Sequence, residues 1–301
     1  MKILITGGTN GMGKGVAKVL AELDNQHHEI IVLGRSQQLG DATIEEIKNA
    51  TKNPKISLIL CDLTKLREVR NAIDEIHKHH TFLDAIFINA GLGYAATRVE
   101  TEDRMDPHFQ VNYLSHFMLL LNLLALLEKS SHGGRVVFNV TRGGEIFWDN
   151  IQMTRNWHYE KGVHQAMVAK RMLLSILHKY YQRSKGSKVA FIGFEIPKTV
   201  WTNQINLIPR GMKIMASIMK SLGMFISIDD CGKIMAPLFT EPQIDNYKKS
   251  GKFLTRKKNR FVEMTEDPKI LNSDLQKKLW RISVELCNDK ITREIAEKFT
   301  Q

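Results

Sequence analysis

A glycine-rich segment near the N-terminus has the residue types and spacing that hold a phosphate group. Gly7, Gly11 and Gly13 lie between a β-branched run at 2–6 and a segment of helical periodicity at 14–23. At such a junction, free backbone N–H groups and the positive end of a helix dipole can meet a pyrophosphate. Gly7 would permit the tight turn, Gly11 the approach of backbone to phosphate, and Gly13 the packing of helix on strand. The pattern predicts a dinucleotide-binding turn that also contains Thr9, Asn10 and Met12; a purely structural turn is the alternative.

The end of the next β-branched run, 29–33, carries residues that bear on the choice of dinucleotide. Arg35 and Ser36 stand where an NAD-binding site usually has an acidic residue for the ribose hydroxyls. A guanidinium can form paired hydrogen bonds with a ribose 2′-phosphate, so we predict NADP(H) rather than NAD(H). The alternative is that Arg35 stacks on the adenine. After the third run, Asp62 and Leu63 are placed to meet the adenine, although Asp62 could equally cap the following helix.

Short β-branched runs alternate with segments of helical periodicity, as in βαβ units of a parallel sheet. The expected strands are 2–6, 29–33, 56–61, 85–89, 135–140 and 188–194. The expected helices are 14–23, 42–51, 66–77, 108–128, 164–181, 210–222, 228–239 and 274–287. We therefore expect an α/β protein with one domain over 1–301: a Rossmann fold with a doubly wound parallel sheet of six to seven strands and helices on both faces.

Further motifs carry a family resemblance. Asn89-Ala90-Gly91 follows the fourth run, and Pro197-Lys198-Thr199-Val200-Trp201-Thr202 follows the sixth. With the glycine-rich turn, these motifs resemble those of the short-chain dehydrogenase/reductase family over nearly the whole chain. The stretches 109–117 and 278–283 are similar to its retinol-dehydrogenase-like branch. The resemblance implies a cofactor site that includes Asn89, Ala90, Gly91, Pro197 and Val200, with Thr202 facing the nicotinamide carboxamide.

In that family an Asn, a Ser, a Tyr and a Lys carry proton transfer around the hydride step. The resemblance places Asn112 where it would hold a relay water, and Thr141 where a hydroxyl orients the substrate. It places Lys170 at the position of the Lys, which is also a cofactor contact. A buried, hydrogen-bonded Asn and an ordinary strand-end Thr are the alternatives. If the alignment of this strand with the family were shifted by one residue, Arg142 would stand at the position of the substrate-orienting hydroxyl in place of Thr141.

The main departure from the family lies four residues before Lys170, where Ala166 replaces the expected Tyr. Three explanations stay open: a laboratory variant, a natural member with another proton donor, or a binding protein that no longer performs reduction. The candidate replacement donors are His164, Tyr159 and a water held by Lys170 and Asn112. A literal Tyr-x-x-x-Lys at 181–185 ends its helix three residues before the sixth strand, so we discount it.

The segment of about 203–227 follows Thr202, where the family carries a substrate-covering lid, and about 245–301 would be a C-terminal extension packed on the same domain. The lid contains four methionines, which suit an adaptable hydrophobic cavity but are equally typical of ordinary core: Met212, Met215, Met219 and Met224. The segment also contains cations, so we also consider peripheral contact with a membrane surface. A hydrophobic carbonyl or alcohol is the expected substrate, and a homodimer is one assembly that we consider.

Composition adds broad limits. The net charge is +11, with a dense basic stretch at 248–260 that has no nucleic-acid motif around it, so we expect a solvated basic face and no nucleic-acid partner. Three cysteines lack metal-ligand spacing, and no signal peptide is apparent, which favours the cytoplasm and no metal site. The apolar run 117–127 is too short for a membrane span and reads as a buried helix. Together these features predict an NADP(H)-dependent carbonyl reductase or alcohol dehydrogenase, with a non-redox NADP(H)-binding protein as the alternative.

Overall fold

Strands and helices alternate along the chain in the computed structural model, which describes residues 1–23, 28–183, 188–202, 205 and 208–299. The strands are β1 (Lys2–Thr6), β2 (Glu29–Gly34), β3 (Ile56–Leu60), β4 (Ala85–Ile88), β5 (Arg135–Asn139), β6 (Ala190–Phe194), β7 (Thr199–Val200), β8 (Phe225–Ile226), β9 (Phe253–Lys257) and β10 (Arg260–Glu263). The main helices are α1 (Gly11–Glu22), α2 (Gln37–Thr51), α3 (Leu66–His79), α5 (Ser115–Glu128), α6 (Tyr159–Arg183), α7 (Arg210–Ser221), α8 (Ile228–Met235), α12 (Ser273–Cys287) and α13 (Lys290–Glu297). Shorter helical segments are α4 (Pro107–Phe109), a π-helical turn (Gln110–Leu114), α9 (Pro237–Thr240), α10 (Gln243–Lys249) and α11 (Pro268–Leu271).

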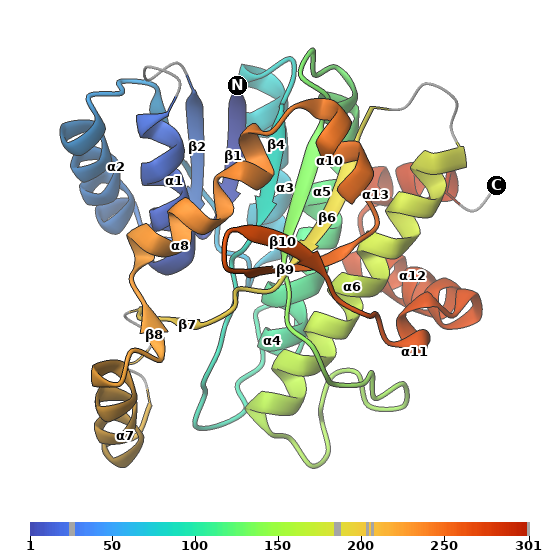
Figure 1. Cartoon of the computed structure of the whole chain (residues 1–301). Helices are drawn as coiled ribbons and strands as arrows, with labels where there is room; N and C mark the ends of the chain where they lie inside the picture. Colours follow the sequence, from blue (N-terminus) through green and yellow to red (C-terminus); the bar gives the residue numbers. More distant parts are fainter. Residues whose placement is uncertain (24–27, 184–187, 203–204, 206–207, 300–301) are drawn as a thin grey trace.

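The central sheet has eight strands in the order β10-β9-β6-β5-β4-β1-β2-β3 (Figure 1). The strands from β3 to β9 pair in parallel, and β10 is antiparallel to β9. The chain winds outward from β1 in both directions, so the doubly wound fold expected from the sequence is confirmed. Ligands of such sheets bind at the carboxyl ends of the strands beside this reversal.

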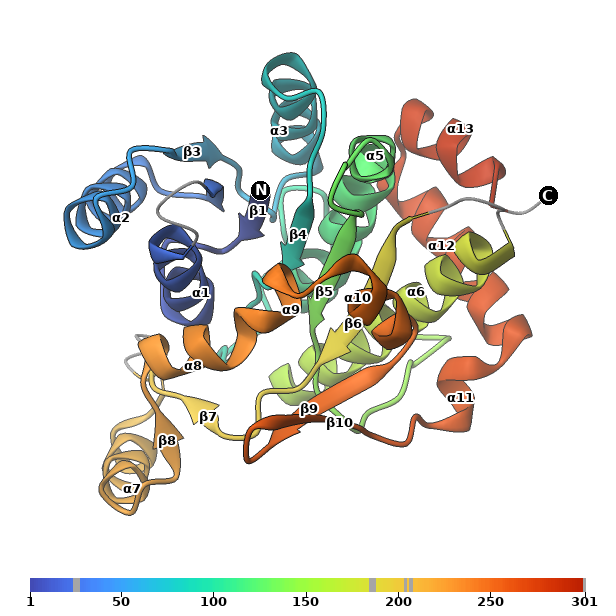
Figure 2. The same ribbon diagram turned by 45° about the horizontal axis from the view of Figure 1, so that its top comes forward.

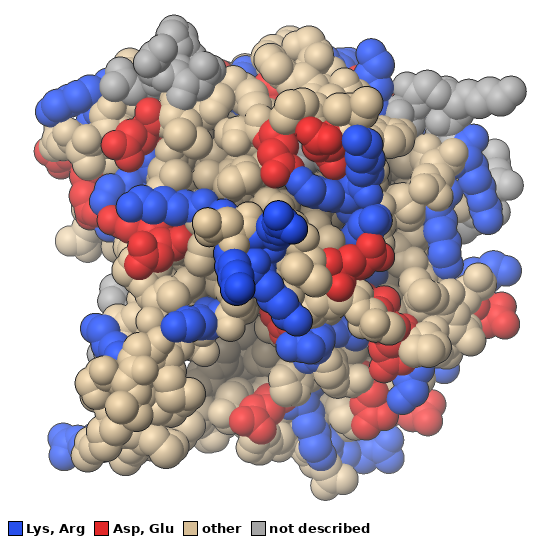
Figure 3. All heavy atoms as spheres, viewed as in Figure 1, with Lys and Arg blue, Asp and Glu red and all other residues tan. Residues whose placement is uncertain are grey.

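Seven of the eight strands pair in parallel, which agrees with the expected parallel sheet of six to seven strands, but the sequence did not locate β9 or the additional antiparallel β10. Strand β9 lies in the basic stretch, β10 begins at its end, and the two form the edge of the sheet (Figure 2). An edge strand has one side open to water, so it tolerates charged residues that hide its strand pattern. Lys257, Lys258 and Arg260 are exposed there, and Figure 3 shows basic side chains gathered over this hairpin.

Helices cover both faces of the sheet, and each face has its own hydrophobic core. Residues of β1 alternate between the two: Ile3 and Ile5 pack in one core with α1, α8 and α9, while Leu4 packs in the other with α3, α5, α6 and α12. Against α1, α8 packs so closely that a Cβ on Gly15 would lie 2.0 Å from the Ile228 carbonyl oxygen. This contact fixes the first turns of α1, where the glycine-rich segment ends.

The apolar run 117–127 lies in a helical stretch, Pro107–Glu128, that matches the expected helix 108–128 to within one residue. The 22 residues Pro107–Glu128 are long and apolar enough to cross a membrane, but 94% of the apolar window is buried in the protein. A buried core helix passes the same test, which agrees with the expected buried helix. The helix starts with the Asp106 side chain accepting from the Phe109 N–H, and its π-helical turn carries Asn112.

Several helix boundaries differ from the expected ones; helix α2, for example, begins at Gln37 and not at 42. Helix α6 begins at Tyr159, not at 164, so Tyr159 lies on the helix and not in the irregular stretch before it. The expected helix 228–239 is interrupted at Ala236, because Pro237 lacks the N–H needed to continue the hydrogen-bond pattern and starts a new helix instead. The strands β7 and β8 form a separate small sheet that leads to α7, which projects from the body of the protein (Figures 1 and 2).

Candidate dinucleotide-binding and catalytic site

The glycine-rich turn lies between β1 and α1, at the carboxyl edge of the sheet. Gly7 has a φ of +66°, which favours glycine, and its N–H donates to the Leu33 carbonyl at 2.9 Å. A Cβ on Gly13 would lie 2.4 Å from the Gly7 carbonyl oxygen, so only glycine fits where α1 meets the turn. Asn10 caps α1, its Oδ1 accepting from the Gly11 N–H at 2.7 Å. The turn thus has the local geometry of a phosphate-binding helix N-terminus.

Thr6 joins this turn to the Asn-Ala-Gly motif after β4. Its Oγ1 accepts from the N–H groups of Asn89 and Ala90 at 2.9 and 3.0 Å, and Asn89 Nδ2 donates to the Thr6 carbonyl at 3.0 Å. A Cβ on Gly7 would lie 2.9 Å from the Cα of Ala90. The two glycine-containing motifs, 82 residues apart, are therefore held in contact at the point where the strand order reverses.

The residues expected at the adenine end lie at the ends of β2 and β3. Arg35 is exposed directly after β2, and Ser36 caps α2 by accepting from the Leu39 N–H at 3.3 Å. Asp62 does not cap α3, because Lys65 is the N-cap residue of that helix. The Asp62 Oδ1 instead accepts from the Thr64 N–H at 3.0 Å. Leu63 is buried in the core, so only its backbone could meet a ligand.

Asn112 is fully buried in the π-helical turn and uses its amide on the loop after β4. Its Oδ1 accepts from the Leu92 N–H at 2.6 Å, and its Nδ2 donates to the Leu92 carbonyl at 3.0 Å. These are the contacts of the buried, hydrogen-bonded Asn that the sequence left as an alternative. The side chain holds the segment that follows Asn89-Ala90-Gly91, and its amide is therefore already engaged by protein groups.

Lys170 lies on α6 with its amine at the end of β5. Nζ donates to the Asn139 carbonyl over 3.4 Å, and Asn139 Nδ2 donates to Asn89 Oδ1 over 3.5 Å. Lys170 is 1% exposed, and burial lowers the pKa of its amine from 10.5 to about 7. Asn139 and Asn89 thus link the amine of Lys170 to the motif that contacts the glycine-rich turn.

Ala166 and Thr141, two other residues of the expected catalytic set, form no hydrogen bond with Lys170. Ala166 lies one turn earlier on α6, is fully buried in the core and has no group that could exchange a proton. Thr141 follows β5 and is exposed, and its carbonyl accepts from Arg171 Nη1 at 2.9 Å. Arg142 beside it binds Glu195 through both its N–H and its guanidinium.

The alternative proton donors lie in different surroundings. His164 is exposed and packs against Gly144, where a Cβ would lie 2.8 Å from the His164 Cβ. Tyr159 stacks edge-on against Tyr94, with ring centres 5.0 Å apart, and its hydroxyl donates to Glu160 at 3.2 Å. Tyr181 is buried with its hydroxyl on Glu128, which agrees with discounting the literal motif; position 185 of that motif lies outside the described residues.

Sequence reasoning missed a buried histidine beneath the turn. His116 lies on α5, with Nε2 3.0 Å from Thr6 Oγ1 and Nδ1 3.4 Å from the Asn112 carbonyl oxygen. Burial, with the nearby charge of Lys170, holds its pKa well below the usual range. The Thr6 hydroxyl also donates to the Phe87 carbonyl at 3.1 Å, so His116 and Phe87 both contact this hydroxyl. The only sequence signal for His116 was its place in the 109–117 motif.

The segment after β6 lies over the start of α1. Thr202 Cγ2 is 3.0 Å from the place where a Cβ on Gly11 would be, and Val200 pairs with Ile226. Pro197 is exposed at the start of this segment. A cavity of about 500 Å³ opens here between the turn, β7, β8 and α7, lined by Asn10, Lys14, Trp201, Thr202, Lys220, Phe225, Ile226, Ser227 and Ile228.

Two lysines in this cavity were not in the expected site. Lys14 Nζ lies 2.6 Å from Glu46, and Lys220 Nζ lies 4.1 Å above the ring of Trp201. Both residues line the cavity beside the glycine-rich turn, so they add positive charge where a pyrophosphate would lie. None of the four methionines of 203–227 is among the described residues that line the cavity, and residues 203, 204, 206 and 207 lie outside the described part.

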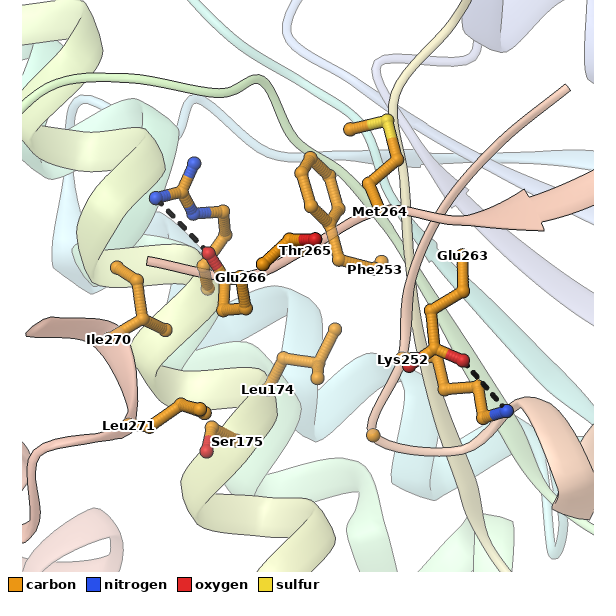
Figure 4. Close-up of a pocket in the computed structure, with 13 residues that line it drawn as sticks. Leu174, Ser175, Lys252, Phe253, Glu263, Met264, Thr265, Glu266, Ile270 and Leu271 are labelled. Atoms are coloured by element: carbon orange, nitrogen blue, oxygen red, sulfur yellow. Dashed lines mark ion pairs between the residues drawn. The ribbon is translucent and has the colours of Figure 1, made fainter. Parts of the chain in front are cut away.

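A second cavity, of about 470 Å³, lies between α6, β9 and the segment 263–271 (Figure 4). Arg171 lines it, 3.4 Å from Glu266 and 5.6 Å above the Phe253 ring. Burial raises the pKa of Glu266 despite this partner. Although Arg171 follows Lys170 and binds the Thr141 carbonyl, no residue expected in the cofactor site lines this cavity.

The fold and these contacts define a Rossmann-type dinucleotide-binding protein. A family model described as short chain dehydrogenase matches residues 1–150. Polyprenol dehydrogenase of Homo sapiens is 34% identical over 137 residues, 44% of this chain and 40% of that protein. Retinol dehydrogenase 14 of Homo sapiens is 30% identical over 173 residues, 52% of this chain and 50% of that protein. Over residues 1–150 the chain belongs to the short-chain dehydrogenase family; it is similar to polyprenol and retinol dehydrogenases and spans half or less of the length of these two relatives.

Solved structures agree on the fold over most of the chain. L-Sorbose reductase from Gluconobacter frateurii, in complex with NADPH and L-sorbose, has a TM-score of 0.65 at 13% identity, covering 85% of this chain and 94% of that one. A short chain dehydrogenase from Burkholderia cenocepacia, in complex with NADP, has a TM-score of 0.63 at 19% identity, covering 84% and 94%. At such identities the likeness shows the fold alone.

Proposed function

We propose that this chain is an NADP(H)-dependent oxidoreductase that interconverts a hydrophobic carbonyl compound and its alcohol. The observation that carries the proposal is the buried amine of Lys170, which reaches Asn139 beside Asn89 and the glycine-rich turn. A nicotinamide bound at this edge would supply or accept the hydride. The turn would bind the pyrophosphate through backbone N–H groups, Thr202 would cover it from β7, and Lys170 would lie next to the reacting centre.

The preference for NADP(H) rests on Arg35. Its exposed guanidinium follows β2 directly and is free of the acidic neighbour that would bind ribose hydroxyls in an NAD site. Two solved structures of the same fold are described as NADP or NADPH complexes, so the fold accommodates this cofactor. In this arrangement Arg35 and Ser36 bind the 2′-phosphate, and Lys14 and Lys220 add positive charge at the pyrophosphate.

The proposed substrate class rests on the cavity and on the relatives. Trp201, Phe225 and Ile226 give the cavity beside the glycine-rich turn an apolar wall, whereas Thr141, Ala166 and Lys170 do not line it. The similar proteins are named for polyprenol and retinol. An apolar wall excludes water from a hydrophobic carbonyl compound and strengthens hydrogen bonds made to its oxygen.

We further propose that 1–301 folds as one domain, with about 203–227 as a lid and about 245–301 as an extension. The extension packs on the core helix, since Ser283 Oγ lies 2.7 Å from the Tyr113 hydroxyl and Trp280 contacts Phe117 at 5.2 Å between ring centres. These contacts explain the motif at 278–283. The three cysteines are free and buried, as suits the reducing cytoplasm that we propose as the compartment.

The test is to restore the missing phenol. In Ala166→Tyr we expect NADPH oxidation over a panel of hydrophobic aldehydes and ketones to rise at least about 10²-fold, the usual size of general acid–base catalysis. Ala166→Phe adds the same ring without the hydroxyl and should not rise. Because position 166 is fully buried, NADPH binding by both variants checks that they fold.

The outcomes separate the explanations of Ala166. Robust turnover by the parent chain, with no gain from the Tyr variant, would mean that another group donates the proton. NADPH binding without turnover in any of the three proteins would favour the second candidate function, a non-redox NADP(H)-binding protein. The observation that favours this second function is the unreactive side chain at position 166. Loss of preference for NADPH over NADH would contradict the role given to Arg35.

A further inference from the structure

Helix α7 projects from the body of the protein and leaves most of its apolar side chains in solvent (Figures 1 and 3). Ile214 and Met215 are 65% and 57% exposed, and Ile218 and Leu222 are 57% and 71% exposed. Ala216 is the helix residue that is buried. The sequence left core packing as an explanation of the methionines here, but Met212, Met215 and Met224 are exposed. Because Ala216 is the one residue of α7 that is buried, the other apolar side chains of this helix form an exposed apolar surface that no described residue covers.

The side chains of α7 separate into two faces. At 100° per residue, 214, 218, 222, 215, 219, 212 and 216 follow one another around one side of the helix. The opposite side carries Arg210, Lys213 and Lys220 with two serines. An apolar face with cations on the polar face is typical of helices that lie in the plane of a membrane surface.

The segment that carries α7 is basic. Residues 197–228 contain four cations and no Asp or Glu: Lys198, Arg210, Lys213 and Lys220. Of the two acidic residues that follow, Asp229 pairs with Lys18 and Asp230 accepts from the Ser227 hydroxyl. A second copy of the chain docked through this helix would bring these like charges together, which opposes pairing. Anionic lipid headgroups would neutralise them, at about 1 kcal/mol for each cation near the surface.

We infer that α7 is an interfacial helix that docks the protein on an anionic membrane surface. The apolar face enters the boundary between headgroups and acyl chains, while Arg210 and Lys213 on the polar face extend to the lipid phosphates. Through Lys220 and the neighbouring Phe225, the docked helix borders the cavity at the glycine-rich turn. The surface does not depend on redox turnover, so it stands or falls separately from the proposed reaction.

The test is flotation of the full chain with phosphatidylcholine vesicles, with and without about 30% phosphatidylserine. The parent chain should bind the anionic vesicles. The double variant Ile214→Gln/Ile218→Gln should lower the partition coefficient about tenfold or more. Ile244→Gln/Leu271→Gln, at apolar positions exposed elsewhere, should leave it unchanged. All four positions are exposed, so the variants should fold, and thermal unfolding followed by circular dichroism checks this.

Charge reversal tests the electrostatic part. Arg210→Glu/Lys213→Glu should remove the preference for phosphatidylserine, whereas Lys257→Glu/Lys258→Glu in the basic β9–β10 hairpin should keep it. The inference is overturned if the hairpin variant loses binding and the α7 variants keep it. It is also overturned if the apolar variants leave vesicle binding unchanged but convert a dimer to a monomer in sedimentation equilibrium, because the face would then bind a second copy.

Discussion

Replacing Lys170 with methionine should stabilise the protein against unfolding near neutral pH. The amine is buried, and the hydrogen bond from Nζ to the Asn139 carbonyl is long, at 3.4 Å. Burial disfavours the charged form and lowers the pKa from 10.5 to about 7. Methionine has a similar length and needs no solvation of a charge. The gain at pH 7 should be on the order of 2–4 kcal/mol.

The pH dependence of the parent chain follows from the same shift. Between the two pKa values, the unfolded chain binds up to one more proton at Lys170 than the folded protein does. The free energy of unfolding of the parent should therefore rise with pH above neutrality. From this group it rises by about 2 kcal/mol between pH 7 and pH 9. Lys170→Met lacks the proton and should not show this part of the rise.

Urea unfolding at pH 7 and pH 9 measures both quantities. The parent should gain about 2 kcal/mol more than Lys170→Met over this interval. Lys161→Met removes an exposed lysine of the same helix and should follow the parent. Equal pH slopes for the parent and Lys170→Met, or a less stable Lys170→Met at pH 7, would refute the reasoning that burial depresses the charge of this amine.

Three further substitutions test the site. Arg35→Ala should weaken NADPH binding about tenfold to a hundredfold and leave NADH binding unchanged in calorimetry; equal losses would contradict a 2′-phosphate contact. Gly13→Ala should abolish NADPH binding, because a Cβ would lie 2.4 Å from the Gly7 carbonyl oxygen. Gly211→Ala, with nothing within 4 Å, is the control, and NADPH binding by Gly13→Ala equal to the parent's would show that the turn relaxes. Tyr159→Phe should leave turnover unchanged, and a loss above about tenfold would make Tyr159 the proton donor.

Much of the fold could be predicted because its signals are local. The first strand has the expected bounds, Lys2–Thr6, since a buried parallel strand is a run of apolar residues that can be recognised within itself. Strands β9 and β10 could not be recognised in this way. Their lysines and arginines are tolerated at a sheet edge, and only pairing with β6, some sixty residues earlier, makes them part of the sheet.

Some features of the candidate site could likewise be predicted from the sequence, and others depend on the tertiary structure. The sequence by itself predicted the glycine-rich turn and Arg35 after the second strand, and the family resemblance predicted the positions of Lys170 and Ala166, because each prediction needs only a residue type at a spacing. The tertiary structure decided which partners the buried polar groups use. It put the Asn112 amide on Leu92, and it left α7 in solvent where the methionine spacing also suited a core. Hydrogen-bond partners and burial depend on segments far apart in the chain, which meet only when the sheet has wound and its helices have packed.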